Sequence, residues 1–333
     1  MFNKSLKILI SPLVIIPTLL VFLILFPNFT YAISRIQSAK NSSAGTSVGA
    51  TWSSATTAGN HLIAIISAVN VSVASFITPP AGWTLAVTKT FTGAETNRSQ
   101  RITIYYKENS ASQTTTGNFT ANSASEGMAL IVAEYSGIST SLSLDQTASN
   151  NGVSLSPSTG NTATTSQAGE LLIGGLGAIS NVTYSSPTNS FSIVDQKTQG
   201  TLLANALLDR IVLTTGTYST GATQSSNSTW GGTIATFKAI PISISGTVYT
   251  DEGNTIMGSG RTVSVSINGA EAAGNTTTAS NGTYTISGLT VNAGDVLTLY
   301  LDGITEKGVT VTKGTGSNLA HIDIYRNDLI TRC

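Results

Sequence analysis

The chain has 333 residues and a net charge of zero, with 10% charged residues and 40% hydrophobic ones. Intrinsic disorder requires low hydrophobicity and high net charge, so this composition excludes a disordered chain. The 16 basic residues form no patch that could follow a phosphate backbone, which disfavours nucleic acid as a partner.

Residues 1–32 have the pattern of an export leader. Lys4 and Lys7 precede an apolar run from Ile8 to Phe26, and a small-x-small cleavage site ends at Ala32. As a helix the run would span about 28 Å, close to a bilayer core, so both a cleaved signal peptide and an uncleaved membrane anchor are open. In either case the remaining chain is expected to be extracellular or at the cell surface, touching a membrane only through this segment.

Residues 33–240 alternate short apolar segments with turns rich in Gly, Ser, Thr and Asn. The segments predicted as strands span residues 46–52, 61–73, 83–91, 101–107, 127–135, 170–179, 191–195, 202–213 and 230–240. Residues 201–210 also permit a short helix, but the matching segment around Tyr105 has a strand pattern. The strand spacing predicts an all-β fold, with a large antiparallel, jelly-roll-like β-sandwich over 33–240.

A phrase that occurs twice, 110 residues apart, predicts an internal duplication. Residues 58–66 read AGNHLIAII and residues 168–176 read AGELLIGGL. We interpret the copies as two halves of one sandwich, each supplying a central strand that is buried on both faces. In this interpretation His61 is a polar strand start, with Glu170 as its equivalent.

Shorter strands and tighter turns follow a break near Pro241. About seven strands predict a small immunoglobulin- or transthyretin-like sandwich over residues 241–327. Asn281-Gly282 is expected to form a turn with a positive φ. Residues 328–333 are interpreted as a truncated tail that ends in the only cysteine, Cys333, which has no internal disulfide partner.

The phrases ISGTVYTDEG, VSVSING and TTASNGTYTISGL, within residues 243–325, resemble the carboxypeptidase-regulatory-like family and the B-repeat modules of bacterial adhesins. This resemblance implies a non-catalytic extracellular spacer. Some B-repeats bind calcium through Asp-rich loops. Asp251, Glu252 and Asn254 lie in the matching loop and are the candidate calcium ligands that the resemblance implies.

The phrases GNHLIAII, TPPAGWTL, IYYK and AEYSGI, within residues 58–240, are similar to a β-sandwich module of bacterial secreted and phage-associated proteins. The similarity implies an extracellular location more than a chemistry. Catalysis has little support in the sequence, because the only two histidines, His61 and His321, fall in different predicted domains and no catalytic motif is present. We therefore predict that the chain is not an enzyme and needs no cofactor other than the candidate calcium.

Four aromatic residues are the candidate ligand-binding side chains: Trp83, Tyr105, Tyr106 and Trp230. Aromatic rings offer a flat face on which sugars can stack. The favoured alternative is that the two tryptophans pack in or cap the core. Tyr105 and Tyr106 are adjacent in a strand and must point to opposite faces of its sheet.

These features predict a secreted or surface-anchored bacterial protein that acts as a structural or adhesion module. Its expected partners are glycans or proteins of the cell envelope or the extracellular space. Two alternatives are open. The chain could be the carbohydrate-binding accessory region of a larger secreted enzyme, or a structural module of an appendage or a phage particle.

Overall fold

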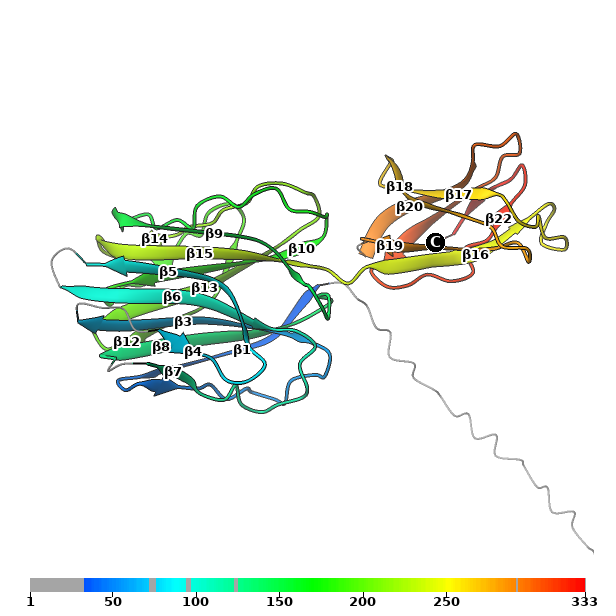
Figure 1. Cartoon of the computed structure of the whole chain (residues 1–333). Coiled ribbons are helices and arrows are strands. Elements are labelled where there is room, and N and C mark those ends of the chain that lie inside the picture. Colours follow the sequence, from blue (N-terminus) through cyan, green and yellow to red (C-terminus); the bar gives the residue numbers. More distant parts are fainter. Residues whose placement is uncertain (1–32, 72–75, 94–96, 123–124, 292, 333) are drawn as a thin grey trace, which may run out of the picture.

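The computed structural model describes residues 33–71, 76–93, 97–122, 125–291 and 293–332. The predicted leader, the last two residues of the predicted strand 61–73, and Cys333 lie outside this part of the chain. The described residues form strands, turns and bends but no helix, which confirms the all-β fold class (Figure 1).

Each half of the first sandwich forms one antiparallel five-stranded sheet. The first sheet contains, in spatial order, β1 (Ser34–Ser43), β8 (Gly127–Ser136), β3 (His61–Val71), β6 (Arg98–Lys107) and β5 (Thr84–Thr92). The second contains β9 (Leu144–Ser154), β15 (Ser228–Lys238), β10 (Glu170–Ala178), β13 (Leu203–Val212) and β12 (Ser192–Gln199). The chain completes one sheet before it starts the other, so the jelly-roll likeness is limited to two antiparallel sheets packed face to face.

The two sheets are duplicates of each other. Strands β1, β3, β5, β6 and β8 are equivalent to β9, β10, β12, β13 and β15, and both sets have the same spatial order. The irregularities are also duplicated, because β5 and β12 each bulge near their start, at Ala86 and Val194, and β1 and β9 bulge at Ile36 and residues 145–146. All four edge strands are therefore bulged, and bulges hinder the pairing of an edge with another chain.

The strand pairing shows that Glu170 is not the equivalent of His61, as we had interpreted the repeat. His61 lies between the sheets against Phe237, and Leu171 belongs to the same core. A shift of 110 residues, which the strand pairing supports, makes Leu171 the equivalent of His61 and makes Asn60 the equivalent of Glu170. Side chains alternate between the two faces of a strand, so an error of one residue would have placed His61 on the wrong face.

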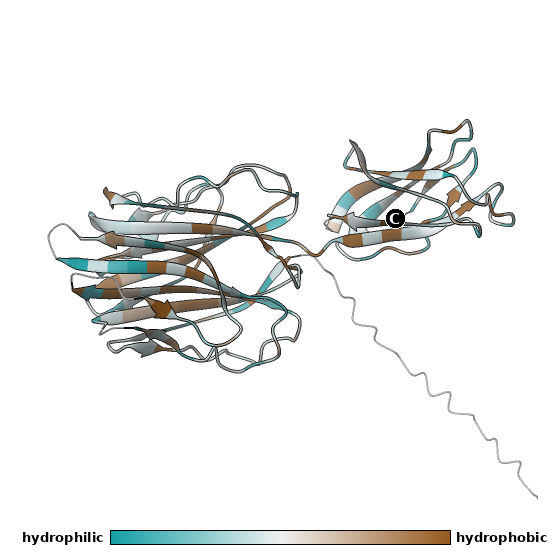
Figure 2. Cartoon of the chain, viewed as in Figure 1, coloured by the Kyte–Doolittle hydropathy of each residue, from teal (hydrophilic) through white to brown (hydrophobic). Residues whose placement is uncertain are grey.

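Three apolar layers stabilise the first sandwich. The central layer lies between the sheets, and Ile63, Ile65, Leu171 and Ile173 are fully buried in it. Loops and short ladders cover the outer face of each sheet, and they include β2 (Ser47–Val48), β4 (Ile77–Thr78), β7 (Phe119–Ala121), β11 (Tyr184–Ser185) and β14 (Thr223–Gln224). Strands β3 and β10 are thus buried on both faces, which explains their nearly continuous apolar sequence. Hydrophobic residues, in brown, recur along the strands of both sandwiches in Figure 2.

The second sandwich has its own core. One of its sheets contains β19 (Thr283–Leu289), β16 (Ile242–Tyr249) and β22 (Ile324–Tyr325). The other contains β18 (Ala270–Thr277), β17 (Thr262–Ile267), β20 (Ala293–Asp302), β21 (Val309–Thr315) and β23 (Leu329–Thr331). Gly282 has a φ of +70°, as the Asn-Gly turn requires. Strand β23 continues the sandwich past residue 327, where we expected a tail.

Candidate functional site

The four predicted aromatic residues lie in three different places. Trp83 and Tyr105 are buried in the outer layer of the first sheet, where the Tyr105 hydroxyl donates to the Ile77 carbonyl at 2.6 Å. Tyr106 packs against the central layer, with its ring stacked on His61 at a centroid distance of 5.6 Å. Trp230 is buried in the second sheet and its Nε1 donates to Ser154 Oγ at 2.9 Å. The structure does not bring these rings together into one exposed platform.

The predicted calcium loop is closed by its own backbone. Asp251 Oδ1 accepts hydrogen bonds from the amides of Gly253, Asn254 and Thr255 at 3.2, 2.8 and 2.9 Å. These amides, that of Thr255 first, hold the pKa of Asp251 below its ordinary value. Within the described part of the chain, no group of three or more His, Cys, Asp or Glu side chains is placed to hold a metal ion.

The polar side chains that do converge lie at the edge where β1 meets β12, which we call the polar seam. A cavity of about 430 Å³ opens there between the two sheets. Arg35 from β1, Tyr135 from β8 and Asp209 from β13 line it, together with Ser190, Ser192 and Arg210. Its volume is within the range of ligand pockets, which are typically 300–1,000 Å³.

One hydrogen-bonded group forms the base of this cavity. Asp209 Oδ2 accepts from Arg35 Nη1 at 2.7 Å and from the Tyr135 hydroxyl at 2.9 Å. Burial raises the pKa of Asp209, and Arg35 and Tyr135 oppose that shift. Burial raises the pKa of the Tyr135 hydroxyl well above its usual range, so the hydroxyl remains a donor. Perturbed titratable groups inside a cleft are a physical mark of a functional site.

The duplication supplies an internal comparison, because β5 meets β9 at a second edge, which we call the apolar seam. The register makes Leu144, Phe237 and Tyr106 the equivalents of Arg35, Tyr135 and Asp209. The Tyr106 and Phe237 rings pack together at a centroid distance of 5.3 Å, and Leu144 contacts the same layer. The same duplicated fold therefore has packed apolar side chains at one seam and a polar cavity at the other.

The loop beside the cavity holds non-glycine residues in a conformation that favours glycine. Ser186, Asn189 and Ser190 have φ values of +47°, +55° and +58°. The matching turns Pro80–Trp83 and Thr188–Phe191 close with the same backbone hydrogen bond, so Gly82 is the equivalent of Ser190. A left-handed non-glycine residue costs about 1 kcal/mol, and such strain gathers at functional sites. At Ser190 this strained residue supplies a hydroxyl to the cavity.

The chemistry of the polar seam suits binding. The Arg35 guanidinium and the hydroxyls of Ser190 and Ser192 can donate, and the Asp209 carboxylate can accept. The ion pair between Lys40 Nζ and Asp195 Oδ1, at 2.6 Å, also joins the two sheets. Arg35, Tyr135 and Asp209 of the cavity lie on strands, and the turn before β12 adds Ser190. Rigid elements hold binding groups more accurately than loops do.

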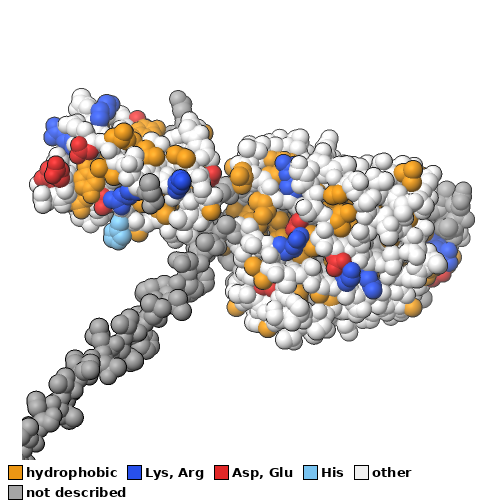
Figure 3. Space-filling view, turned by 180° about the vertical axis from the view of Figure 1, so that it is seen from behind, with side chains coloured by type: hydrophobic (Ala, Val, Ile, Leu, Met, Phe, Trp, Pro, Cys, Tyr) orange, Lys and Arg blue, Asp and Glu red, His pale blue; other side chains and the backbone are white. Residues whose placement is uncertain are grey.

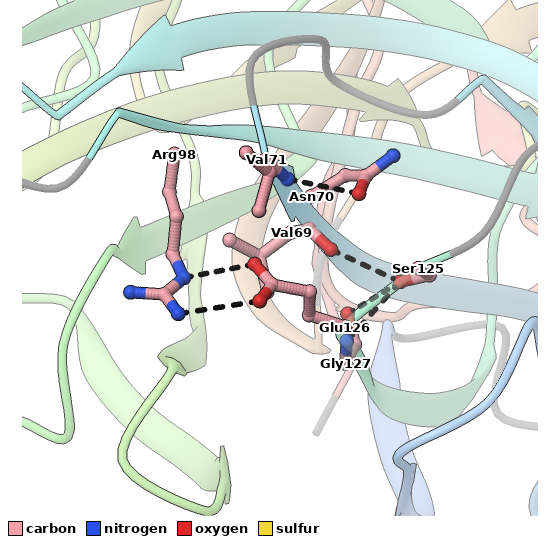
Figure 4. A network of polar contacts seen from close by, with 7 residues as sticks. All are labelled: Val69, Asn70, Val71, Arg98, Ser125, Glu126 and Gly127. Atoms are coloured by element: carbon pink, nitrogen blue, oxygen red, sulfur yellow. Dashed lines mark hydrogen bonds and ion pairs between the residues drawn. The ribbon is translucent and has the colours of Figure 1, made fainter.

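A second polar cluster lies at the other end of strands β3 and β8 (Figure 4). Arg98 donates to both oxygens of Glu126, at 2.8 and 3.2 Å, and the Ser125 hydroxyl donates to the carbonyls of Val69 and Gly127. The charged groups of this cluster satisfy each other across β6 and the start of β8. We assign the cluster to the structure of the sandwich end.

Glu170 is a buried carboxyl at the start of β10, next to the Thr236 hydroxyl and the Asp145 carboxylate. Burial raises its pKa to about 7, with a smaller contribution from the neighbouring Asp145 carboxylate. A raised carboxyl pKa gives stability that is complete below the unfolded value near 4.5 and is lost as pH rises towards 7.

We therefore expect the unfolding free energy of the wild type to fall by up to about 3 kcal/mol between pH 4.5 and 7 because of Glu170. Glu170→Gln should not show this fall. Urea unfolding at pH 5 and pH 8 measures the effect. Glu252→Gln, at an exposed carboxyl, should keep the wild-type pH dependence. Equal pH dependence in wild type and Glu170→Gln would contradict the assignment.

Arg35 and Asp209, the ion pair of the polar seam, were not among the sequence-based candidates. Arg35 and Asp209 are 174 positions apart, so only the packing of β1 against the second sheet brings them together. One signal was available. Aligning the two halves strand by strand places Leu208-Asp209-Arg210 opposite Tyr105-Tyr106-Lys107, which exposes a carboxylate that the first half lacks.

Fold and seam together define a class of protein, namely an internally duplicated two-sheet β-sandwich followed by a smaller β-sandwich. Comparison with known proteins does not narrow this class, because no protein-family model and no curated protein matches the chain. No helix in the described part of the chain is long and apolar enough to cross a membrane.

Proposed function

We propose that the chain is an exported, non-catalytic surface module that contacts extracellular or cell-envelope glycans, with the polar seam as its contact point. The observation that carries the proposal is the open polar cavity between two rigid sheets, at a place where the duplicate seam is filled with aromatic rings. The face drawn in Figure 3 carries few charged side chains, and the sequence is rich in Ser, Thr and Asn, whose hydroxyl and amide groups suit sugars.

The edge strands favour this function over that of a self-assembling appendage. All four edges of the first sandwich are bulged, and one ion pair, Lys40 with Asp195, joins the edge strands β1 and β12. Such edges resist addition of a strand from another copy. The second sandwich, with its separate core, fits the role of a spacer that presents the first.

The test is a binding measurement with the full chain. We expect saturable binding to at least one member of a panel of immobilised neutral and acidic polysaccharides, measured by biolayer interferometry. Asp209→Asn keeps the size of the side chain and removes its charge, so it should weaken that binding about tenfold. Binding to no member of the panel would overturn the glycan proposal, and undiminished binding by Asp209→Asn would overturn the assignment to the seam.

A further inference from the structure

An exposed aromatic ring lies on the outer side of the first sheet, away from the polar seam. Phe76 precedes β4, and 60% of its side chain is exposed. The Arg101 guanidinium lies over this ring, with its Cζ 4.1 Å from the ring centroid. Arg101 comes from β6, which β3 and β8 separate from β1 and the polar seam. One face of the ring is therefore covered by a cation, and the rest of the ring is accessible.

Two hydrogen bonds fix the backbone that carries the ring. The Phe76 amide donates to Asn122 Oδ1 at 2.8 Å, and the Asn122 amide donates to the Phe76 carbonyl at 2.9 Å. The exposed Asn122 side chain keeps its Nδ2 group for other acceptors. A ring that is already held in place loses little conformational freedom when a ligand stacks on it, which favours binding.

The second half of the chain lacks this ring in an equivalent setting. Thr183 and Ser225 exchange the same two hydrogen bonds, at 3.1 and 2.9 Å, so Thr183 is the equivalent of Phe76. The strand pairing makes Ala204 the equivalent of Arg101. The fold therefore does not require an exposed ring at this position, and the guanidinium that supports the ring is missing where the ring is missing.

Arg101 has hydrogen-bond donors that the described residues leave unused. Its Nε is buried without a hydrogen-bond partner in this part of the chain, and none of the carboxylates described there forms an ion pair with it. A guanidinium has five N–H donors. The terminal Nη groups can therefore donate to a molecule that covers the ring, so the site combines an apolar face with polar groups at its edge.

We propose that Phe76, Arg101 and Asn122 form a second saccharide contact, in which a pyranose ring stacks on the free face of Phe76 and its hydroxyls accept from Arg101 and Asn122. This inference rests on the proposed glycan-binding function and adds a stacking site to it. A pyranose has C–H groups on its faces and hydroxyls around its rim, which matches an aromatic ring bordered by donors. The polar seam has no such face, because Tyr135 is buried there.

Phe76→Thr tests the stacking face by installing the residue of the second half. The side chain is largely exposed, so the variant should keep the wild-type unfolding transition in urea. Biolayer interferometry of the full chain, on the polysaccharide of the panel that the wild type binds most tightly, should show about tenfold weaker binding. Arg101→Gln should weaken binding about threefold. Val153→Thr, at an aliphatic side chain that is 61% exposed, is the matched control and should bind as the wild type does.

Phe76→Trp supplies a signal from the site itself. The variant keeps an aromatic face at the surface, so it should bind at least as tightly as the wild type. The emission of the new indole should move to shorter wavelength when the same polysaccharide is added in soluble form, because stacking removes water from the ring. The wild type, whose three tryptophans are buried, is the spectral control.

The possible results separate this inference from the proposed function. Undiminished binding by Phe76→Thr, or no change in the Phe76→Trp emission at saturation, would overturn the inference and leave glycan binding at the polar seam standing. An equal loss of binding in Val153→Thr would show a general effect of surface substitutions and would also overturn it. Binding to no polysaccharide of the panel would overturn the inference and the proposed function together.

Discussion

His61→Leu is expected to make the protein about 3 kcal/mol more resistant to unfolding at pH 4 than the wild type. The His61 imidazole is completely buried between the sheets, against Tyr106 and Phe237, and neither ring nitrogen has a hydrogen-bond partner among the described residues. Burial lowers its pKa from 6.5 to about 3. Leucine is the residue that the second half of the chain places at the equivalent position, Leu171.

Acid destabilises the folded protein at His61 because burial lowers the pKa of this side chain. The folded state resists protonation, so the stability attached to neutral His61 is present above pH 6.5 and is lost as pH falls towards 3. The slope is about 1.4 kcal/mol per pH unit. Glu170 acts in the opposite direction between pH 4.5 and 7, so the two groups together favour a stability maximum in mildly acidic solution.

Guanidinium unfolding at pH 4, 5.5 and 7 measures the effect of His61→Leu. His321→Asn changes an exposed histidine with a φ of +60°, which asparagine tolerates, and should follow the wild type at every pH. If His61→Leu and wild type lose stability in parallel below pH 6.5, His61 is not buried in its neutral form.

Trp83→Ala is expected to destabilise the first sandwich by about 3–5 kcal/mol, because it removes a large side chain from a closed apolar layer. Trp83 is 7% exposed and packs edge-on against Phe119 at a centroid distance of 5.3 Å. The equivalent residue in the second half is Phe191, which is also buried. Trp83→Phe should therefore lose less, about 1–2 kcal/mol.

Guanidinium unfolding of Trp83→Ala measures this loss and tests whether Trp83 belongs to the core or to a ligand platform. Leu142→Ala, at a side chain that is 84% exposed, should shift the unfolding free energy by less than about 0.5 kcal/mol. A Trp83→Ala protein as stable as the Leu142→Ala control would contradict the core assignment and return the ring to the list of ligand contacts.

The central strands could be predicted because burial determines their composition. Strands β3 and β10 are covered on both faces, so their sequences are almost entirely apolar and the repeated phrase marks them. The segment at residues 201–210, which also permitted a helix, enters strand β13. Its pairing with β10 and β12 decides the conformation, and that information is not local.

Besides the short strands β4, β7, β11 and β14, the sequence pattern missed two long strands, the equivalent edges β1 and β9. Their sequences SRIQSAKNSS and LDQTASNNGVS are polar and lack a clear alternation. Each strand pairs on one side only and bulges near its start, so neither face imposes an apolar period. The candidate site was missed for the same reason, since Arg35 lies on β1 and meets Asp209 only after the two sheets have packed.

The membership of the second sandwich in the carboxypeptidase-regulatory-like or B-repeat families stays a prediction, as do export and the bacterial origin. Asp251 Oδ1 already accepts hydrogen bonds from three backbone amides, and a calcium ion would compete with them for this oxygen.

The most direct test of the account is to locate the ligand contact by hydrogen–deuterium exchange of the full chain, with and without the polysaccharide of the panel that binds it most tightly. We predict that protection increases in residues 33–38, 186–193 and 207–212, which surround the polar seam, and does not change in residues 81–87 and 103–108 at the apolar seam. Protection at both seams, or at neither seam while another surface is protected, would contradict the claim that one half of this duplicated sandwich carries the binding site.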